Sequence, residues 1–175
     1  MLTVLATLFS LISCADGAIN WQKLDFYPAS NNSYVVSVGD AKHLDEIVIP
    51  KTYFGKPVVE IEENGFRNCE RLERITIPNS ITSIGSMAFE GCQKLKNVEI
   101  RDGVTSIDQS AFYGCKSLES IVIPKSVTSI GERAFYGNGS FISIKYRGTE
   151  EEWNSINKEN NWIYRYDIIY NYDGE

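Results

Sequence analysis

The sequence predicts a β-rich solenoid, in which short strands stack coil upon coil and both ends are capped. Two observations carry this prediction: a motif of 23 residues recurs in strict register, and its apolar positions alternate as they do in a strand. A single unit of this size cannot bury its own apolar face, whereas stacked units can, with a rise of about 4.8 Å per coil.

The repeat is clearest in three consecutive units that begin at Leu72, Leu95 and Leu118. Each has the pattern Leu-x-x-Ile/Val-x-Ile, then Thr-Ser-Ile, then Ala-Phe. An earlier copy begins at Leu44 with five extra residues around Tyr53 to Lys56, and the phase continues at the other end into Phe141. Identical apolar residues therefore recur 23 positions apart. They are Ile77, Ile100 and Ile123; Ile84, Ile107 and Ile130; and Phe66, Phe89, Phe112 and Phe135. Phe66 belongs to the copy that begins at Leu44 and follows its extra residues.

Each part of one unit has a physical interpretation. Ile75 to Ile77 alternates as a short strand whose apolar residues face inward, and Pro78 ends it because proline cannot donate to a sheet ladder. Gly85 permits a bend, and Ala88-Phe89 places a small and a large core residue on a brief helical turn.

The ends of the array have the features of caps. Tyr34, Val36 and Val38 alternate as a strand before the first repeat, while Thr149 and Glu152 are spaced as a capping box that begins a helix. From Trp162 to Tyr172 every even position is aromatic or apolar, which predicts a strand that covers the open end of the core; an aromatic platform for a glycan or a partner is the alternative. The predicted division is a leader 1–15, an N-terminal cap 16–43, repeats 44–148 (44–71, 72–94, 95–117, 118–140 and a partial 141–148) and a C-terminal cap 149–175.

These motifs resemble the BspA-like type of leucine-rich repeat. The resemblance rests on IPNSITSIGSMAFEGC at 77–92, IPKSVTSIGERAFYG at 123–137 and FGKPVVEI at 54–61, and it covers about residues 44–156. It implies a right-handed coil with short strands and a non-catalytic, adhesion-type role through protein contacts. The unit at Leu95 departs from the pattern, because Arg101-Asp102-Gly103 replaces the proline turn and Asp108 replaces a glycine.

The first fifteen residues predict export. Leu2 to Ile12 is an uncharged apolar run that is too short to span a bilayer core of about 30 Å. Leu11-Ile12-Ser13-Cys14 resembles a bacterial lipobox, so Cys14 is a candidate for lipidation, although the run lacks the usual preceding Lys or Arg. A secreted or surface-anchored protein is therefore expected, with membrane contact only through a lipid on Cys14.

Composition and motifs argue against most chemistry. A net charge of −6 without a Lys/Arg block makes nucleic-acid binding a poor expectation. Cys69, Cys92 and Cys115 lie 23 apart as one column, which predicts small buried thiols rather than a zinc site. His43, the one histidine, has Asp40, Asp45 and Glu46 nearby and is expected to face solvent. We expect no enzyme activity, no cofactor and no metal.

The candidate binding surface consists of outward positions on the predicted strands. These positions vary between units while the core positions repeat, as expected of a scaffold that presents a face. The predicted function is binding to a host, matrix or cell-surface protein by a monomeric chain; the alternative is a structural spacer or part of a larger array without its own partner. The candidate residues are Glu46, Val48, Arg74, Thr76, Asn97, Glu99, Ser120, Val122 and Lys145, with Ser143 in the first of the two columns.

Overall fold

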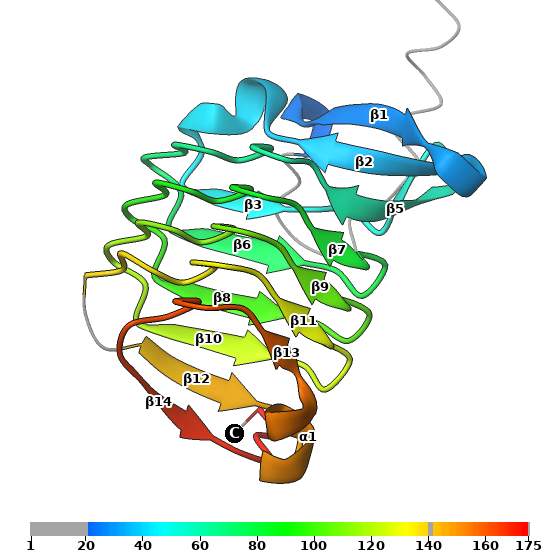
Figure 1. Cartoon of the computed structure of the whole chain (residues 1–175). Helices are drawn as coiled ribbons and strands as arrows, with labels where there is room; N and C mark the ends of the chain where they lie inside the picture. The colour runs from blue at the N-terminus through cyan, green and yellow to red at the C-terminus, as the bar shows by residue number, and fades with distance from the viewer. Residues whose placement is uncertain (1–20, 140–141, 175) are drawn as a thin grey trace, which may run out of the picture.

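The computed structural model describes residues 21–139 and 142–174, and in it the chain winds into a β-solenoid (Figure 1). The predicted leader and Cys14 lie outside the described residues. Within them the chain forms a six-stranded sheet on one side of the coils and an eight-stranded sheet on another. The sequence period is therefore the path of one coil, since each strand pairs with its equivalent one repeat later, and the predicted solenoid is confirmed.

The six-stranded sheet is built from the Leu-x-x-Ile-x-Ile part of the repeat. All of its pairings are parallel, and they join each strand to the same positions of the next coil, for example Ile75 to Val98 and Ile77 to Ile100. The alternation of buried and exposed residues along each strand follows from the period of two. Its strands, in sheet order, are β14 (Tyr166–Ile169), β12 (Ile142–Tyr146), β10 (Ser120–Ile123), β8 (Asn97–Ile100), β6 (Arg74–Ile77) and β3 (Glu46–Val48).

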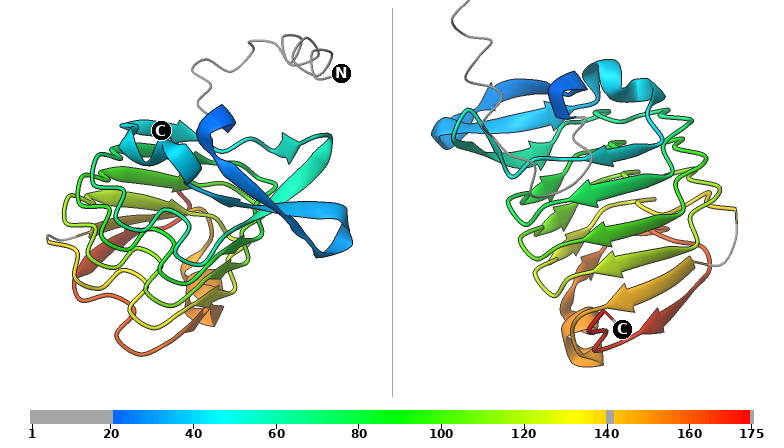
Figure 2. Two further views of the ribbon diagram at one scale, coloured as in Figure 1. Left: turned by 90° about the horizontal axis from the view of Figure 1, so that it is seen from above. Right: turned by 180° about the vertical axis from the view of Figure 1, so that it is seen from behind.

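The eight-stranded sheet contains the Ser-Ile step of each repeat and the N-terminal strands. Ser83-Ile84 pairs in parallel with Ser106-Ile107, and that strand with the next. At the N-terminal end the sheet extends beyond the coils, as the view from above shows (Figure 2). Its strands are β1 (Asp25–Ala29), β2 (Ser33–Ser37), β5 (Lys56–Ile61), β7 (Ser83–Ile84), β9 (Ser106–Ile107), β11 (Ser129–Ile130) and β13 (Asn157–Lys158), with β4 (Thr52–Tyr53) paired to β5.

The third side of each coil contains turns, and here the predicted helical turn at Ala88-Phe89 is wrong. Met87, the residue before this pair, has a φ of 55°, which is incompatible with a right-handed helix. The N–H of Phe89 donates to the carbonyl of Ala111 in the next coil at 2.7 Å, and the same bond recurs from Phe66 to Ala88 and from Phe112 to Ala134. The N–H groups on this side therefore alternate between two kinds of partner. Those such as Phe89 donate to the next coil, and those such as Ala88 donate to the carbonyl three residues earlier, in single turns that do not continue as a helix.

Stacked identical side chains form the core. Phe66, Phe89, Phe112 and Phe135 are buried and stack with ring centroids 5.0–5.3 Å apart and interplanar angles of 7–15°. Isoleucines from both sheets, together with leucines, valines, alanines and the cysteines, fill much of the rest of the interior. This distance is close to the spacing of about 4.8 Å between strands, so the rings follow the rise of the coils.

The N-terminal end combines strands with short 3-10 helices. These are η2 (Trp21–Lys23), η3 (Ser30–Asn32) and η4 (Gly39–His43). The five extra residues of the first repeat belong to the hairpin of β4 and β5, whose two turn residues Phe54 and Gly55 both have positive φ, as a tight hairpin requires. Tyr53 of this hairpin stacks on Phe26 at 4.1 Å and covers the edge of the core.

The C-terminal end forms a further coil. Thr149 and Glu152 form the predicted capping box of helix α1 (Glu150–Ser155), which directs Trp153 into the core. The predicted strand over 162–172 is wrong in its extent, because only Tyr166–Ile169 pairs as β14. The residues before it belong to the turn side, where the carbonyl of Trp162 accepts from Phe135, and those after it turn back so that Asn171 donates to Gly148.

The irregular unit keeps its register. Gly103 has a φ of 125°, and a Cβ there would lie 2.3 Å from the carbonyl oxygen of Asn79, so this turn requires glycine. Ser126 from the next coil accepts from the N–H of Gly103 at 3.2 Å and donates to the carbonyl of Val104 at 2.8 Å. The Ser126 hydroxyl of the neighbouring coil therefore stabilises the turn of this unit, which lacks the proline found in the other units.

Candidate functional site

The parallel register aligns the outward residues of the six-stranded sheet into two columns. The first passes through Glu46, Arg74, Asn97, Ser120 and Ser143, and the second through Val48, Thr76, Glu99, Val122 and Lys145. We call this surface the strand face. The sequence analysis missed its last members, Asp167 and Ile169 on β14, because the step from β12 to β14 is one residue longer than the repeat and its residues do not follow the motif.

Ion pairs between coils lie on and beside the strand face. Arg74 pairs with Glu46 at 3.1 Å, and Lys96 pairs with Glu73 at 2.9 Å, which lowers the pKa of that carboxyl from its usual value through the hydrogen bond to the ammonium. Arg147 crosses two coils to reach Glu99 at 2.9 Å, while its buried Nε makes no hydrogen bond. Exposed pairs of this kind are weak and can be exchanged for pairs with a partner.

The middle of the strand face combines one charged residue, Glu99, with uncharged neighbours. Ser120 donates to the side-chain oxygen of Asn97 at 2.7 Å, and Thr76 and Val122 are partly exposed beside them. At the C-terminal side, the ammonium of Lys145 lies over the ring of Tyr172, 5.0 Å from its centroid. The arrangement has no nucleophile beside a base. It is an exposed surface that mixes charged, hydroxyl, amide and apolar side chains, which suits protein contact.

The Thr-Ser step that recurs in each repeat has a structural role. Each threonine hydroxyl donates to a carbonyl of the preceding coil: Thr82 to Val59, Thr105 to Thr82 and Thr128 to Thr105, at 3.0–3.1 Å. The Ser83 and Ser106 hydroxyls are 3.0 Å apart. These threonine and serine hydroxyls therefore form hydrogen bonds that join neighbouring coils.

The cysteine column is a packing feature. Cys69, Cys92 and Cys115 are free and buried, as predicted. The thiol of Cys92 donates to the carbonyl of Phe66 at 3.1 Å and that of Cys115 to Phe89 at 3.2 Å. Burial raises the pKa of the Cys115 thiol to about 12. The hydrogen bond with the Cys69 thiol, together with burial, raises the pKa of Cys92, so neither Cys92 nor Cys115 supplies a thiolate at neutral pH.

His43 does not belong to a metal centre within the described residues. It lies exposed at the end of η4, with Asp40 in the same short helix. Across residues 21–139 and 142–174, no three His, Cys, Asp or Glu side chains gather in a way that could hold a metal ion. The same residues contain no helix that is long and apolar enough to cross a bilayer.

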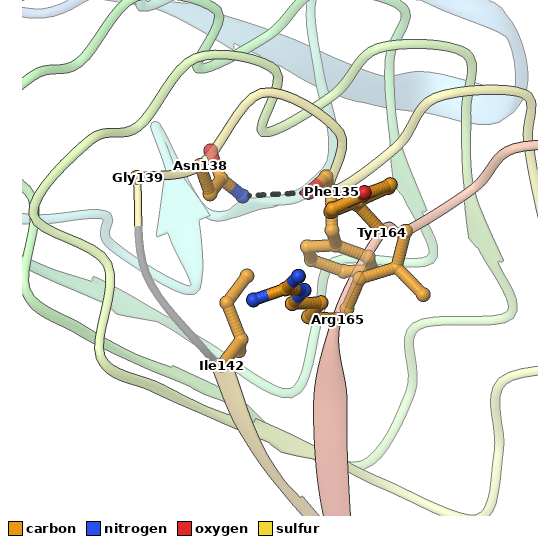
Figure 3. Close-up of a pocket in the computed structure, with 7 residues that line it drawn as sticks. Phe135, Asn138, Gly139, Ile142, Tyr164 and Arg165 are labelled. Atoms are coloured by element: carbon orange, nitrogen blue, oxygen red, sulfur yellow. Dashed lines mark hydrogen bonds between the residues drawn. The ribbon is translucent and has the colours of Figure 1, made fainter.

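A small cavity opens at the last coils (Figure 3). It has a volume of about 180 Å³ and is lined by Phe135, Asn138, Gly139, Ile142, Ile163, Tyr164 and Arg165. The amide of Asn138 donates to the carbonyl of Phe135 at 2.9 Å, and the Arg165 side chain points into the space beside Ile142. Pockets for drug-sized ligands begin at about 300 Å³, so this cavity is too small to hold one.

The aromatic residues near the C-terminus divide between two roles. Trp162, Ile168 and Tyr170 pack against the core, as the capping interpretation predicts. Tyr164 and Tyr166 are 72% and 38% exposed, respectively, so the even positions do not share one buried face.

Short coils with a common period of 23 residues, two largely parallel sheets and stacked apolar columns define the class of leucine-rich repeat solenoids. The sequence model described as "BspA type leucine rich repeat region" matches residues 40–160 in six copies, so the chain belongs to this family. No curated protein matches the chain.

Solved structures of leucine-rich repeat proteins share the fold. A leucine-rich cell-surface protein from Faecalibacterium prausnitzii is 28% identical over 78% of this chain and 41% of its own, with a TM-score of 0.62. A leucine-rich repeat protein from Bacteroides ovatus is 26% identical over 75% and 40%, with a TM-score of 0.58. A T. pallidum leucine-rich repeat protein, 23% identical over 85% and 83% with a TM-score of 0.58, shares the fold. The chain thus spans about two fifths of the first two proteins.

Proposed function

We propose that the chain is a non-catalytic interaction module, secreted or held at the cell surface, whose strand face binds a host, matrix or cell-surface protein. The observation that carries the proposal is the register of the six-stranded sheet, which aligns dissimilar side chains over an unchanging core. A solenoid of this kind holds its surface residues on a rigid frame while leaving their identity free. The description of the Faecalibacterium relative as a cell-surface protein supports the location.

The experiment uses a triple variant, Arg74→Glu with Glu99→Lys and Val122→Arg. All three residues lie on the strand face, and their side chains point away from the core, so the thermal midpoint should change little. Binding to immobilised matrix proteins and to intact cells should fall at least about tenfold, because charge is reversed at two positions and added at a third.

A matched control carries the same kinds of change elsewhere. Glu63, Gln109 and Arg133 are exposed on the turns that follow the eight-stranded sheet. The combination Glu63→Lys, Gln109→Arg and Arg133→Glu should bind as the unchanged chain does. Equal binding by the strand-face variant and the unchanged chain would exclude this face as the site.

A structural spacer is the second candidate. About six coils at roughly 4.8 Å each give a solenoid under 30 Å long, which is short for a surface that reads a large partner. A well-folded chain that retains no matrix or surface protein would favour this role. Mass measurement of the mature N-terminus separates lipidation of Cys14, plain cleavage and no processing.

A further inference from the structure

The strand β14 has one edge without a partner among the described residues. It ends the order of the six-stranded sheet and lies at the outer end of the solenoid (Figures 1 and 2). Large side chains are exposed on it and beside it: Tyr164 by 72%, Tyr166 by 38% and Ile169 by 47%. An open strand edge of this kind is a template for a further strand.

The backbone of β14 determines which groups point outward. The N–H of Ile142 donates to the carbonyl of Arg165 at 3.4 Å, and the register pairs Ile142 with Tyr166 and Ile144 with Ile168. In a parallel ladder, alternate residues direct both backbone groups to the same neighbour. The backbone N–H and C=O groups of Asp167 therefore point toward β12. Those of Tyr166 and Ile168 point away from the sheet.

We propose that β14 pairs antiparallel with β14 of a second copy, about a two-fold axis at Tyr166. A contact between the same strand of two copies is self-complementary and closes after two molecules. Antiparallel pairing requires outward-pointing groups to lie opposite one another, so Tyr166 and Ile168 must meet residues of the same kind. Four registers, centred on residues 165, 166, 167 and 168, meet this requirement.

Charge selects one of the four registers. With Tyr166 opposite Tyr166 of the partner subunit, Arg165 lies opposite the partner's Asp167, and the symmetry makes this pair twice. The register centred on residue 165 places Arg165 opposite the partner's Arg165, and the register centred on residue 167 places Asp167 opposite the partner's Asp167. The register centred on residue 168 places no charged residues opposite each other. Opposite charges across strands stabilise a pair and like charges destabilise it, so the first register is favoured.

Arg165 and Asp167 are free to make this contact. Both are exposed, and neither forms an ion pair with another residue in the described part of the chain. The side chain of Arg165 lines the cavity of Figure 3, with its guanidinium 5.4 Å from the centroid of the Tyr164 ring. Because this side chain is exposed, it reaches a partner by rotating out of the cavity. Pairing would also cover Tyr166 and Ile168 at the end of the core. A dimer differs from the monomer that the sequence alone predicts, because the sequence does not show that β14 ends the sheet.

Charge exchange tests the proposal. The mass of the full chain in solution would be measured by sedimentation velocity for the unchanged protein, for Arg165→Asp, for Asp167→Arg and for the two changes together. We expect a dimer for the unchanged chain and at least about tenfold weaker association for each single variant, since each change creates two like-charge contacts. The combined variant should associate within about threefold of the unchanged chain, because it restores opposite charges with their order reversed.

Controls separate pairing at β14 from other causes. Lys125→Glu reverses an exposed charge on the turn after β10 and should leave the dimer intact. Circular dichroism checks that each variant is folded, and Asp167→Asn provides a milder change at the same position. A chain that stays monomeric at about 100 µM overturns the proposal. So do single variants that associate as well as the unchanged chain, or a combined variant that does not recover.

Discussion

The inner phenylalanine column and the outer columns of the strand face follow the same register but obey opposite rules. Inside, four identical rings from Phe66 to Phe135 stack nearly parallel and are at most 1% exposed. Outside, Glu46, Arg74 and Asn97 occupy one column without any resemblance. The two sets show that equivalent positions need identical residues only where a side chain is packed between the equivalent side chains of the adjacent coils.

The difference has an energetic basis. A buried phenylalanine contacts the rings on both sides, so a change affects three coils at once. An exposed ion pair such as Arg74–Glu46 exchanges contacts with water for contacts with each other and contributes little. The outer columns are therefore free to serve binding without a cost in folding.

The strongest test of this comparison is Phe112→Ala. Phe112 stacks on Phe89 at 5.0 Å and on Phe135 at 5.3 Å, and the cavity left behind would lie between two coils that cannot collapse independently. We expect the free energy of unfolding to fall by about 3–5 kcal/mol. Urea denaturation followed by circular dichroism measures the loss.

The neighbouring residue supplies the matched control. Tyr113 also has an aromatic neighbour in the next coil, Tyr136 at 6.2 Å, but it is 36% exposed. Tyr113→Ala should cost less than about 1.5 kcal/mol, since only an exposed stacking contact is lost. If both substitutions cost the same, stacking rather than burial holds the coils together.

Two glycine positions, Gly131 and Gly55, extend the comparison between inner and outer positions to the backbone. A Cβ at Gly131 would lie 2.5 Å from the backbone nitrogen of Gln109, whereas a Cβ at Gly55 meets nothing within 4 Å. We expect Gly131→Ala to cost about 2–3 kcal/mol through overlap between coils. Gly55→Ala should cost about 1 kcal/mol, because its φ of +74° is the only obstacle. Thermal denaturation of the two variants gives the difference.

Asp108 determines how this result is interpreted. Gly85, Asp108 and Gly131 occupy the same position in three consecutive coils. A side chain is thus present where both neighbours in the column are glycine. If Gly131→Ala is as mild as Gly55→Ala, consecutive coils can both carry a side chain there, and the alternation is not required by packing.

The repeat made most of the fold predictable. A constant period fixes which strands are neighbours, so the members of the strand face on β3 to β12 followed from counting alone. The capping box at Thr149 was also local enough to be identified. The order of the strands required no long-range information, because each coil contacts the next one in sequence.

Other features could not be predicted because they depend on the backbone or on irregular spacing. The left-handed φ of Met87 replaced a predicted helical turn, and methionine gives no signal for that conformation. The last coil is longer than the repeat, so Asp167 and Ile169 did not appear as members of the strand face. Arg147 reaches across two coils to Glu99, a contact that only the three-dimensional path shows.

The smallest expected effect concerns the left-handed column itself. Asn64, Met87, Ser110 and Arg133 occupy the same position in successive coils, with φ between 55° and 59°. Only asparagine adopts this region readily among the four, so the other three positions carry backbone strain that neither the inner nor the outer columns share. Ser110 is the best site for a test, because its side chain is small and its N–H, which donates to Glu132, is kept by any replacement except proline.

We expect Ser110→Asn to stabilise the chain by about 0.5–1 kcal/mol, since asparagine relieves the strain without adding the flexibility of glycine to the unfolded chain. Ser110→Gly should gain less, because glycine relieves the strain but loses more entropy on folding. Ser117, which is partly exposed and lacks a positive φ, provides the control, where Ser117→Gly should destabilise by about 0.5 kcal/mol. Urea midpoints of the three variants decide the matter. If both changes at Ser110 lower the urea midpoint as the change at Ser117 does, these residues adopt the left-handed conformation without strain. The left-handed positions would then follow neither the rule of the inner columns nor that of the outer columns.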